Sequence, residues 1–229
     1  MITEDNPRWS RVTIEQLVEG HKIAKPADGN HGEIHPKKAD FVGTGIPFIM
    51  ASDLRGGSVD QEHCNFLSRR QADSLRTGFA KNGDVLLSHK GTIGRVAILR
   101  TEHDYVMLTP QVTYYRILDR NALDARFLYY SFMTRNFQDT LYRYANEGST
   151  RAYIGITKQL GLRCTFPSLE EQSQIVTVLD GLSANIERLE RLYQSRLADL
   201  VELKQAILRK AVAGELTAHP EKALQEAAE

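Results

Sequence analysis

The sequence predicts a mixed α+β protein in which one globular domain, a curved β-sheet with flanking helices, precedes a long C-terminal coiled-coil helix. Short runs of β-branched and aromatic residues separated by glycine-containing turns predict the strands. Helical patterns follow these runs, and beyond residue 167 apolar residues recur at heptad spacing. We therefore expect a domain over residues 1–166, a long helix over residues 167–214 and a polar, disordered tail over residues 215–229.

The elements of the first domain follow from local patterns. A capping box at residues 13–16 opens a short helix, because the Thr13 hydroxyl and the Gln16 side chain can each bond a backbone N–H. Strand-like runs occupy residues 47–50, 85–88, 95–99 and 111–117. Two helical stretches then cover residues 124–134 and 137–145, and the second places Phe137, Leu141 and Tyr144 on one face.

The long helix has start and stop signals of its own. Ser168 and Glu171 form a capping-box pair, and Gly214 supplies a stop, because glycine adopts the left-handed conformation that ends helices. Gly181 is a soft point at which the helix can bend. With Gln172 at heptad position a, the predicted dimerisation seam consists of Ile175, Leu179, Leu182, Ile186, Leu189, Tyr193, Leu200, Leu203 and Ile207.

The length of this helix decides what covers the seam. At 1.5 Å per residue it measures on the order of 65 Å, too long for a compact domain of about 165 residues to bury. We therefore expect the seam to recruit a second copy of the chain. The alternative is a core helix packed inside this chain.

The composition limits the class of protein. With 41% hydrophobic and 25% charged residues, the chain is typical of globular proteins. It has no apolar run of about eighteen residues, and its N-terminus is polar, so we expect a cytoplasmic protein with no membrane partner. Cys64 and Cys164 stand in no disulfide or metal-ligand spacing and are interpreted as reduced thiols.

The net charge of zero hides an asymmetry. Residues 1–165 carry 22 Lys and Arg against 18 Asp and Glu, whereas residues 166–229 carry 7 against 11. A mildly basic front and an acidic back fit a DNA-facing domain joined to a protein-facing segment.

Catalytic motifs are missing. The sequence holds no phosphate-binding loop, no G-x-S-x-G nucleophile elbow, no zinc-deaminase pattern and no Gly-rich Rossmann turn. Asp84 and Lys90 suggest a carboxylate-and-lysine nuclease, but Ser88 stands where a second metal-binding carboxylate is needed. We therefore expect no catalytic residue, no metal site and no cofactor, with a metal-dependent DNA enzyme as the weaker alternative.

Three loops are rich in groups that bind DNA. Residues 88–95 combine glycines, which allow close backbone approach, with two basic side chains and a hydroxyl; the alternative is a hairpin turn that needs its glycines for geometry. Residues 28–38 concentrate amides, imidazoles and lysines, the groups that bond base edges in the major groove. Residues 148–151 form a polar, basic segment. The last two segments are also typical of ordinary surface loops.

Taken in order, several segments resemble the DNA-specificity subunits of Type I restriction-modification systems. They are Gly45–Ile49 with Ser52–Leu54, Gly83–Leu86 with Ser88 and Lys90–Arg95, Pro110-Gln111, Gly148–Thr150, Pro167–Gln172 with Ile175-Val176, and Leu203–Leu208 with Ala211 and Gly214–Leu216. A full subunit of that family carries two target-recognition domains, each followed by a conserved helix. This chain has one such pair, so it resembles a half-length subunit or a shortened version of a full one.

The resemblance implies the partners. Two copies would associate through antiparallel C-terminal helices, and each target-recognition domain would read one half of a bipartite site on double-stranded DNA. The helix pair would dock methyltransferase subunits, which bring S-adenosylmethionine and flip an adenine, and through them restriction subunits that use ATP and magnesium. A protein-only coiled-coil adaptor is the main alternative.

Base-reading residues vary in that family, so the prediction of DNA contacts rests on residue chemistry. The predicted DNA-binding residues are Asn30, His31, Lys37, Ser52, His89, Lys90, Thr92, Arg95, Ser149, Thr150, Arg151 and Lys158.

Overall fold

The structure is a computed structural model that describes residues 9–146 and 152–216. The chain divides into two compact units, Met1–Thr177 and Val178–Glu229. The predicted boundary lay at residue 166, so the first unit is longer than the sequence suggested. The difference arises because the first turns of the long helix pack against the domain, as described below.

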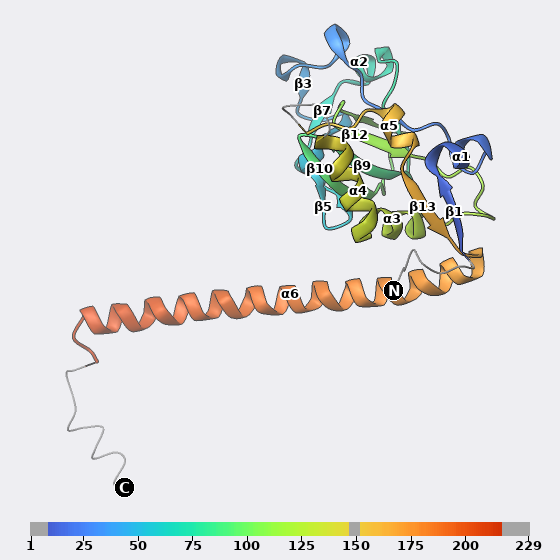
Figure 1. Cartoon of the computed structure of the whole chain (residues 1–229). Coiled ribbons are helices and arrows are strands. Elements are labelled where there is room, and N and C mark those ends of the chain that lie inside the picture. Colours follow the sequence, from blue (N-terminus) through green and yellow to red (C-terminus); the bar gives the residue numbers. More distant parts are fainter. Residues whose placement is uncertain (1–8, 147–151, 217–229) are drawn as a thin grey trace. The chain divides into compact units, whose positions relative to one another are not determined.

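The first unit is built on two main sheets and is mixed helix and sheet, as predicted (Figure 1). One has the strand order β10-β9-β12-β2, formed by Thr92–Ile98, Val85–Lys90, Val112–Tyr115 and Ala27–Asp28. The other has the order β3-β7-β4-β11-β8, formed by Phe41–Val42, Asn65–Leu67, Ile46–Ile49, Val106–Leu108 and Phe79–Ala80. Two smaller sheets pair β1 (Ser10–Thr13) with β13 (Arg163–Phe166), and β5 (Leu54–Arg55) with β6 (Ser58–Val59).

The sequence predicts one curved sheet, whereas the structure has two main sheets, and the composition of β9 explains the difference. Its run Val85-Leu86-Leu87 is apolar without alternation, which is typical of a strand buried on both faces. Leu87 packs in a cluster with Phe127 and other helical residues, whereas Leu86 packs with Leu108 in a second cluster. Helices therefore cover one face of this sheet, and residues of the other sheet cover the opposite face.

Five short α-helices also lie in the described part of the first unit. They are α1 (Ile14–Glu19), α2 (Arg69–Ser74), α3 (Ala125–Met133), α4 (Arg135–Asn146) and α5 (Ile156–Leu160). The capping box of α1 forms as predicted, since Gln16 N donates to Thr13 Oγ1 (3.2 Å) and Thr13 N donates to Gln16 Oε1 (2.9 Å). Phe137 and Leu141 of α4 are buried in the helical cluster, and Tyr144 packs against it. This face of α4 is the one that its spacing predicted.

The long helix α6 spans Leu169–Val212, close to the predicted 167–214. Glu171 N donates to Ser168 Oγ (3.3 Å), but the Glu171 carboxylate accepts from the indole N–H of Trp9 (3.0 Å). The cap at the helix start is thus joined to the N-terminal strand region. At the other end Gly214 has φ of 74° and donates to Ala211 O, while Glu215 N donates to Lys210 O. This pair of bonds is the Schellman pattern that glycine permits.

The first turns of α6 belong to the domain. Gln172 is buried, and its amide donates to Ala122 O and Pro167 O (both 3.0 Å) and accepts from Asp124 N (3.0 Å). Gln172 is therefore a docking residue and not the first position of the seam. Ile175, predicted as a dimerisation residue, packs partly against the domain core, which corrects the start of the seam.

Candidate nucleic-acid interface and helix seam

The tip of the β9–β10 hairpin carries two of the predicted DNA contacts. Lys90 and Thr92 face each other across Gly91, which has φ of 76°. A side chain at that φ is strained, so the hairpin needs this glycine for its geometry. This agrees with the alternative interpretation of residues 88–95 as a hairpin turn. Lys90 and Thr92 are both exposed, and Lys90 makes no ion pair with any residue in the described part of the chain.

A second segment lies against this tip. Gly91 N donates to Ala152 O (3.4 Å), and Ile154 N donates to His89 O (3.1 Å). Between them Tyr153, 40% exposed, places its ring 5.7 Å from the His89 ring and 5.7 Å from Lys90 Nζ. Ser149, Thr150 and Arg151 fall outside the described residues, but they directly precede this segment in the sequence.

The loop after β2 supplies a third segment. His31 Nε2 donates to Asp28 Oδ2 (2.9 Å), and His89 Nε2 lies 3.5 Å from the same oxygen. His89 is fully buried, and its Nδ1 donates to Ile154 O (3.0 Å). The Asp28 carboxylate therefore holds His31 of this loop and lies near the unpartnered Nε2 of His89, while the Nδ1 of His89 joins the hairpin strand to Ile154.

Burial keeps two of these imidazoles neutral. Desolvation lowers the pKa of His89 to about 4, against the opposing influence of Asp28 and the Ile154 carbonyl. Burial also lowers the pKa of His35, opposed by a hydrogen bond to the backbone at Asn30. Lys90 therefore lies near two imidazoles that are neutral near pH 7.

Of the other predicted DNA contacts, some are exposed side chains and some are buried residues that hold the fold together. Lys37 is exposed. Asn30 is 3% exposed, and its amide donates to Thr77 O (2.6 Å) and accepts from Arg76 N (2.9 Å), so it holds two loops together. Neither Asn30 nor the buried His89 has a side chain facing solvent. We therefore remove both from the set of direct base contacts.

Arg95, Ser52 and Lys158, three further predicted DNA contacts, make hydrogen bonds that do not involve the residues of the hairpin tip. Arg95 Nη1 donates to Ala51 O (3.2 Å) and Ser52 O (3.1 Å), so it closes the turn that carries the exposed Ser52. Lys158 Nζ donates to Tyr144 O (3.3 Å) in the last turn of α4. Their contact with DNA remains a prediction. Sequence reasoning missed Tyr153 and Asp28, although an aromatic residue next to the basic 148–151 segment was a usable signal.

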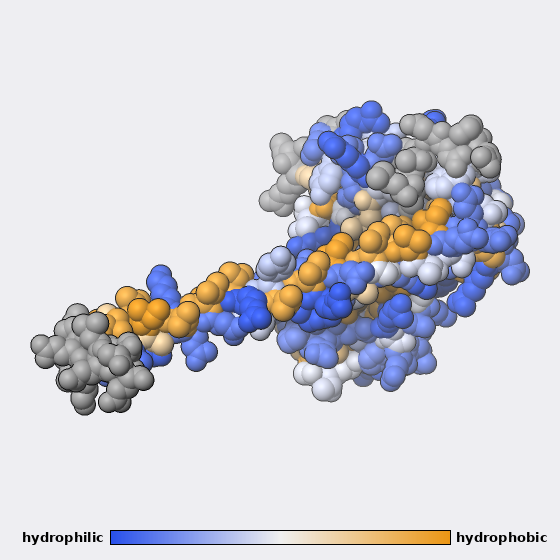
Figure 2. All heavy atoms as spheres, turned by 90° about the horizontal axis from the view of Figure 1, so that it is seen from below, coloured by the Kyte–Doolittle hydropathy of each residue, from blue (hydrophilic) through white to orange (hydrophobic). Residues whose placement is uncertain are grey.

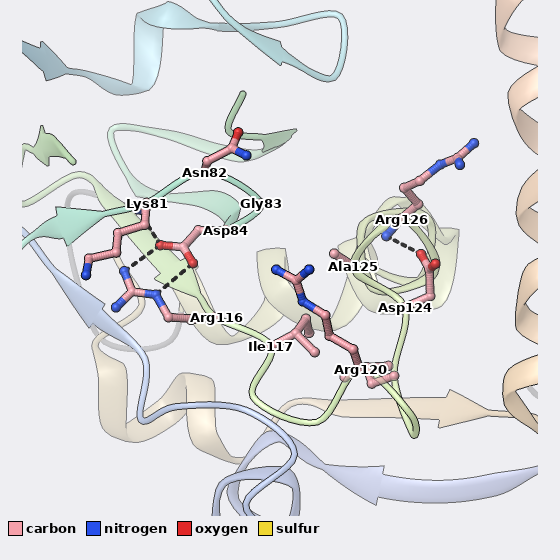
Figure 3. A pocket seen from close by; sticks show the side chains of 11 residues that line it. Lys81, Asn82, Gly83, Asp84, Arg116, Ile117, Arg120, Asp124, Ala125 and Arg126 are labelled. Carbon is pink, nitrogen blue, oxygen red and sulfur yellow. Dashed lines mark hydrogen bonds and ion pairs between the residues drawn. The ribbon is translucent and has the colours of Figure 1, made fainter. Parts of the chain in front are cut away.

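The carboxylate that a nuclease site would need, that of Asp84, is bound by other groups of the chain. Figure 3 shows Asp84 bound to Arg116, which donates from Nε (2.9 Å) and Nη2 (2.7 Å), while Lys81 N donates to Oδ2 (2.7 Å). These residues line a cavity of about 510 Å³ together with Arg120 and Arg126. The carboxylate of Asp84, which directly precedes β9, is thus paired with the Arg116 guanidinium. Lys90 is the last residue of the same strand, so it lies at the opposite end from Asp84. Within the described residues no group of His, Cys, Asp and Glu is placed to hold a metal ion.

The second candidate surface is the part of α6 after Thr177. Leu182, Ile186 and Leu189 are 53%, 56% and 47% exposed. The other predicted seam residues Tyr193, Leu200, Leu203 and Ile207 are exposed as well, and Leu179 is half-buried. Figure 2 shows an orange, hydrophobic band along this part of the helix, bordered by blue, hydrophilic side chains. Leu197 lies next to Arg196, a charged residue at heptad position d, and continues the band.

Residues 12–195 match the family model described as the Type I restriction modification DNA specificity domain. Since this match covers more than half of the chain, the chain belongs to that family, and the resemblance inferred from its motifs is confirmed. Within residues 9–146 and 152–216, none of the helices has the length and apolar character needed to span a bilayer.

Similar proteins agree with this assignment. The chain is 26% identical over 218 residues to the specificity subunit of the Type I restriction enzyme EcoBI of Escherichia coli, which covers 95% of this chain and 43% of that subunit. A solved chain from work on complex assembly and conformational transition of the type I R-M system has a TM-score of 0.66 at 22% identity. The HsdS subunit from Thermoanaerobacter tengcongensis has a TM-score of 0.61 at 22% identity.

These two solved structures share the fold of a sheet-rich domain followed by a long helix. Each aligns with 92% of this chain, over 47% and 46% of its own length. The chain therefore spans a little less than half the length of the relatives that it matches.

Proposed function

We propose that this chain is a non-catalytic, sequence-reading subunit of a Type I restriction-modification complex. Family membership over residues 12–195 carries the DNA-reading part of the proposal. The hairpin tip, residues 152–154 and the loop after β2 form one exposed cluster with Lys90, His31 and Tyr153 at its surface. A basic side chain beside an exposed aromatic ring is a suitable combination for contacts with DNA.

The exposed band on α6 supports the assembly part of the proposal. Exposed leucine and isoleucine at heptad spacing are stable in water when a second helix covers them. Two copies related by a two-fold axis would then hold two identical recognition domains, which read identical, inverted half-sites. For both to lie on one face of the duplex, the half-site centres would be about 10 base pairs or a multiple of that apart.

Partner subunits would supply the chemistry. In this proposal methyltransferase subunits dock on the helix pair and bring S-adenosylmethionine, and restriction subunits that use ATP and magnesium join through them. The complex acts on chromosomal DNA in the cytoplasm. The engagement of Asp84 by Arg116 supports the absence of catalysis in this chain, because that carboxylate is not available to a metal.

The decisive experiment is to co-express the chain with the methyltransferase encoded beside it and to map methylated adenines across the genome. We expect a split, inverted-repeat motif, and the chain alone to sediment as a dimer at micromolar concentration. Methylation without sequence preference would favour a protein-only adaptor and would contradict the proposal.

A variant pair links this result to the hairpin tip. Lys90→Ala is expected to weaken specific DNA binding of the assembled complex by about 1 to 3 kcal/mol if it contacts a base. Arg100→Ala is the matched control, because Arg100 is an exposed cation just beyond the other end of β10. Equal effects of the two substitutions would move the DNA-reading face away from the tip.

A further inference from the structure

A small pocket opens beside the hairpin tip, and we name it the Gln111 pocket. It has a volume of about 290 Å³ and is lined by His31, Gly32, His35, Met50, Lys90, Thr109, Pro110 and Gln111. His31 and Lys90 are exposed side chains of the candidate nucleic-acid interface. The pocket therefore adjoins the surface that we propose to face DNA.

Two buried polar atoms of residues that line this pocket lack hydrogen-bond partners. Thr109 is 4% exposed, and its Oγ1 has no hydrogen-bond partner among the described residues; the same holds for the buried Nδ1 of His35. The two other unpartnered buried side-chain atoms in the described part of the chain are His89 Nε2 and Thr113 Oγ1. Thr113 pairs with Asp28 on one side and Leu87 on the other, so it lies on the strands that lead into the pocket.

This concentration of unpartnered atoms points to a ligand. Buried polar groups in folded proteins are almost always hydrogen-bonded, because leaving one unsatisfied is energetically unfavourable. A polar partner that enters from outside would restore the missing bonds. The lining thus has the character of a binding site and not of a packing defect.

Backbone hydrogen bonds hold Gln111 in a fixed position in the lining of the pocket. Val112 N donates to Thr109 O (3.1 Å), so residues 109–112 form a tight turn in which Pro110 occupies the second position. Gln111 O accepts from His89 N (2.9 Å), and Thr109 N donates to Ile49 O (3.0 Å). The Gln111 side chain makes no hydrogen bond within the described residues. A side-chain amide that makes no internal hydrogen bond, held on a fixed backbone, is preorganised to bind a polar ligand.

The chemistry of the lining favours a base over a phosphate. Lys90 is the one Lys or Arg among the lining residues, and none of them is a carboxylate. Gln111 and Thr109 can each donate and accept hydrogen bonds, and Met50 and Pro110 add an apolar wall. A phosphate seat would gather several cations, whereas a base edge presents donors and acceptors side by side.

We propose that the Gln111 pocket receives the major-groove edge of one adenine of the half-site and that Gln111 is a specificity-determining residue. A glutamine amide can accept from the adenine N6 amino group and donate to N7 at the same time. Thr109, whose buried hydroxyl has no hydrogen-bond partner among the described residues, lines the same pocket. This inference rests on the proposed function and adds the site and the base that it reads.

The test uses the assembled complex with its cognate methyltransferase and a duplex library randomised one position at a time around the wild-type motif. Gln111→Ala and the isosteric Gln111→Glu should relax or alter preference at one base pair of each half-site, with discrimination there falling at least about tenfold. Preference at all other positions should stay as in the wild type. Thr109→Val, which removes the hydroxyl at nearly constant volume, should weaken binding to the same motif several-fold.

The control is Gln61→Ala, a half-buried glutamine whose amide bonds the Arg100 carbonyl beyond the far end of β10. It should leave the motif unchanged, and thermal melting of each variant checks the fold. A motif that is unchanged in both Gln111 variants overturns the inference, as does uniform weakening at every position, which marks a phosphate seat. If the wild-type complex itself shows no sequence preference, the proposed function fails. This result is distinguishable from an unchanged motif and from uniform weakening, because both of those require a wild-type complex that has a preference.

Discussion

The sheet-rich domain and the part of α6 after Thr177 differ in where their apolar side chains lie. In the domain, Phe132 and Tyr115 are fully buried, and three clusters account for its core. Between Val178 and Val212, most leucine, isoleucine and valine side chains are exposed. The domain thus contains the contacts that stabilise it, whereas the helix presents the same kind of side chain to solvent.

This difference separates two sources of stability. The domain gains free energy from its own buried surface. The helix has surface pairs such as Arg191–Glu187 (3.8 Å) and Arg196–Asp199 (3.6 Å), and exposed ion pairs of this kind contribute little. We infer that substitutions in the helix change assembly, whereas substitutions in the domain change folding. Four predictions test this separation.

The largest effect is expected at the seam. Replacing Ile186 and Leu189 together with Asp should give monomers, since each buried aliphatic side chain contributes about 1.5 to 3 kcal/mol and a dimer loses four of them. Sedimentation velocity measures the change. Ala184→Asp with Ser195→Asp adds the same charge at exposed heptad positions f and c, outside the seam, and should leave the dimer intact. A dimer that survives the seam substitutions would mean that another surface joins the copies.

The next effect is expected in the domain core. Phe132 stacks on Phe137 (4.4 Å between centroids) and meets Tyr115 edge-on (4.8 Å), so Phe132→Ala should cost about 3 to 5 kcal/mol of unfolding free energy. Urea unfolding followed by fluorescence of Trp9, the single tryptophan, reports on this domain. The exposed neighbour Met133→Ala is the control. Loss of the dimer in Phe132→Ala, while the domain is still folded, would contradict the separation.

A smaller effect is expected from pH. The pKa of His89 is lowered to about 4 by burial, so between pH 6.5 and 4 the unfolded chain binds more protons than the folded one. The domain is therefore expected to lose about 2 to 3 kcal/mol as the pH falls through this window, and the full contribution is present above pH 6.5. His35, whose pKa burial also lowers, adds in the same direction.

Urea unfolding at pH 7.5, 6 and 5 measures this loss. His89→Gln should flatten the pH dependence, even if it lowers stability at pH 7.5. The segment from Val178 to Val212 contains no histidine, so the dimer dissociation constant should change little between pH 7.5 and 6. An unaltered pH slope in His89→Gln would show that other groups govern this window.

The smallest effect is expected at Gly181. A Cβ placed there meets nothing within 4 Å, and the residue lies at heptad position c, so Gly181→Ala should stabilise the helix by about 0.8 to 1.0 kcal/mol. Gly214→Ala is the opposite control, because φ of 74° strains an alanine and should weaken the helix end. Thermal melting by circular dichroism should place the wild type between the two. A lower melting temperature for Gly181→Ala would indicate that the helix needs its flexible point.

Local pattern was sufficient for the helices α1, α3, α4 and α6 and for four of the strands. Caps and periodicity depend on residues three or four apart, so α6 was predicted within two residues at each end and the capping box of α1 was correct. The strands at residues 47–50, 85–88, 95–99 and 111–117 correspond to β4, β9, β10 and β12. Their division between two sheets was not predictable in the same way, because pairings such as β4 with β11 join segments far apart in the chain.

The candidate site shows the same limit. Residue chemistry singled out the hairpin tip and the loop after β2, and in the structure Lys90 of the tip and His31 of the loop line the same pocket. Residue chemistry did not reveal that Asn30 and His89 are buried, because they bond residues 76–77 and 152–154, which are distant in the sequence.

The sequence by itself determined that this chain has a DNA-specificity family pattern and a helix with an apolar stripe, because both are written in short-range order. The tertiary structure alone decided which polar residues remain at the surface, where the seam begins and which atoms lack partners beside Gln111. These depend on contacts between distant segments, which cover some residues that are polar by type and leave others exposed.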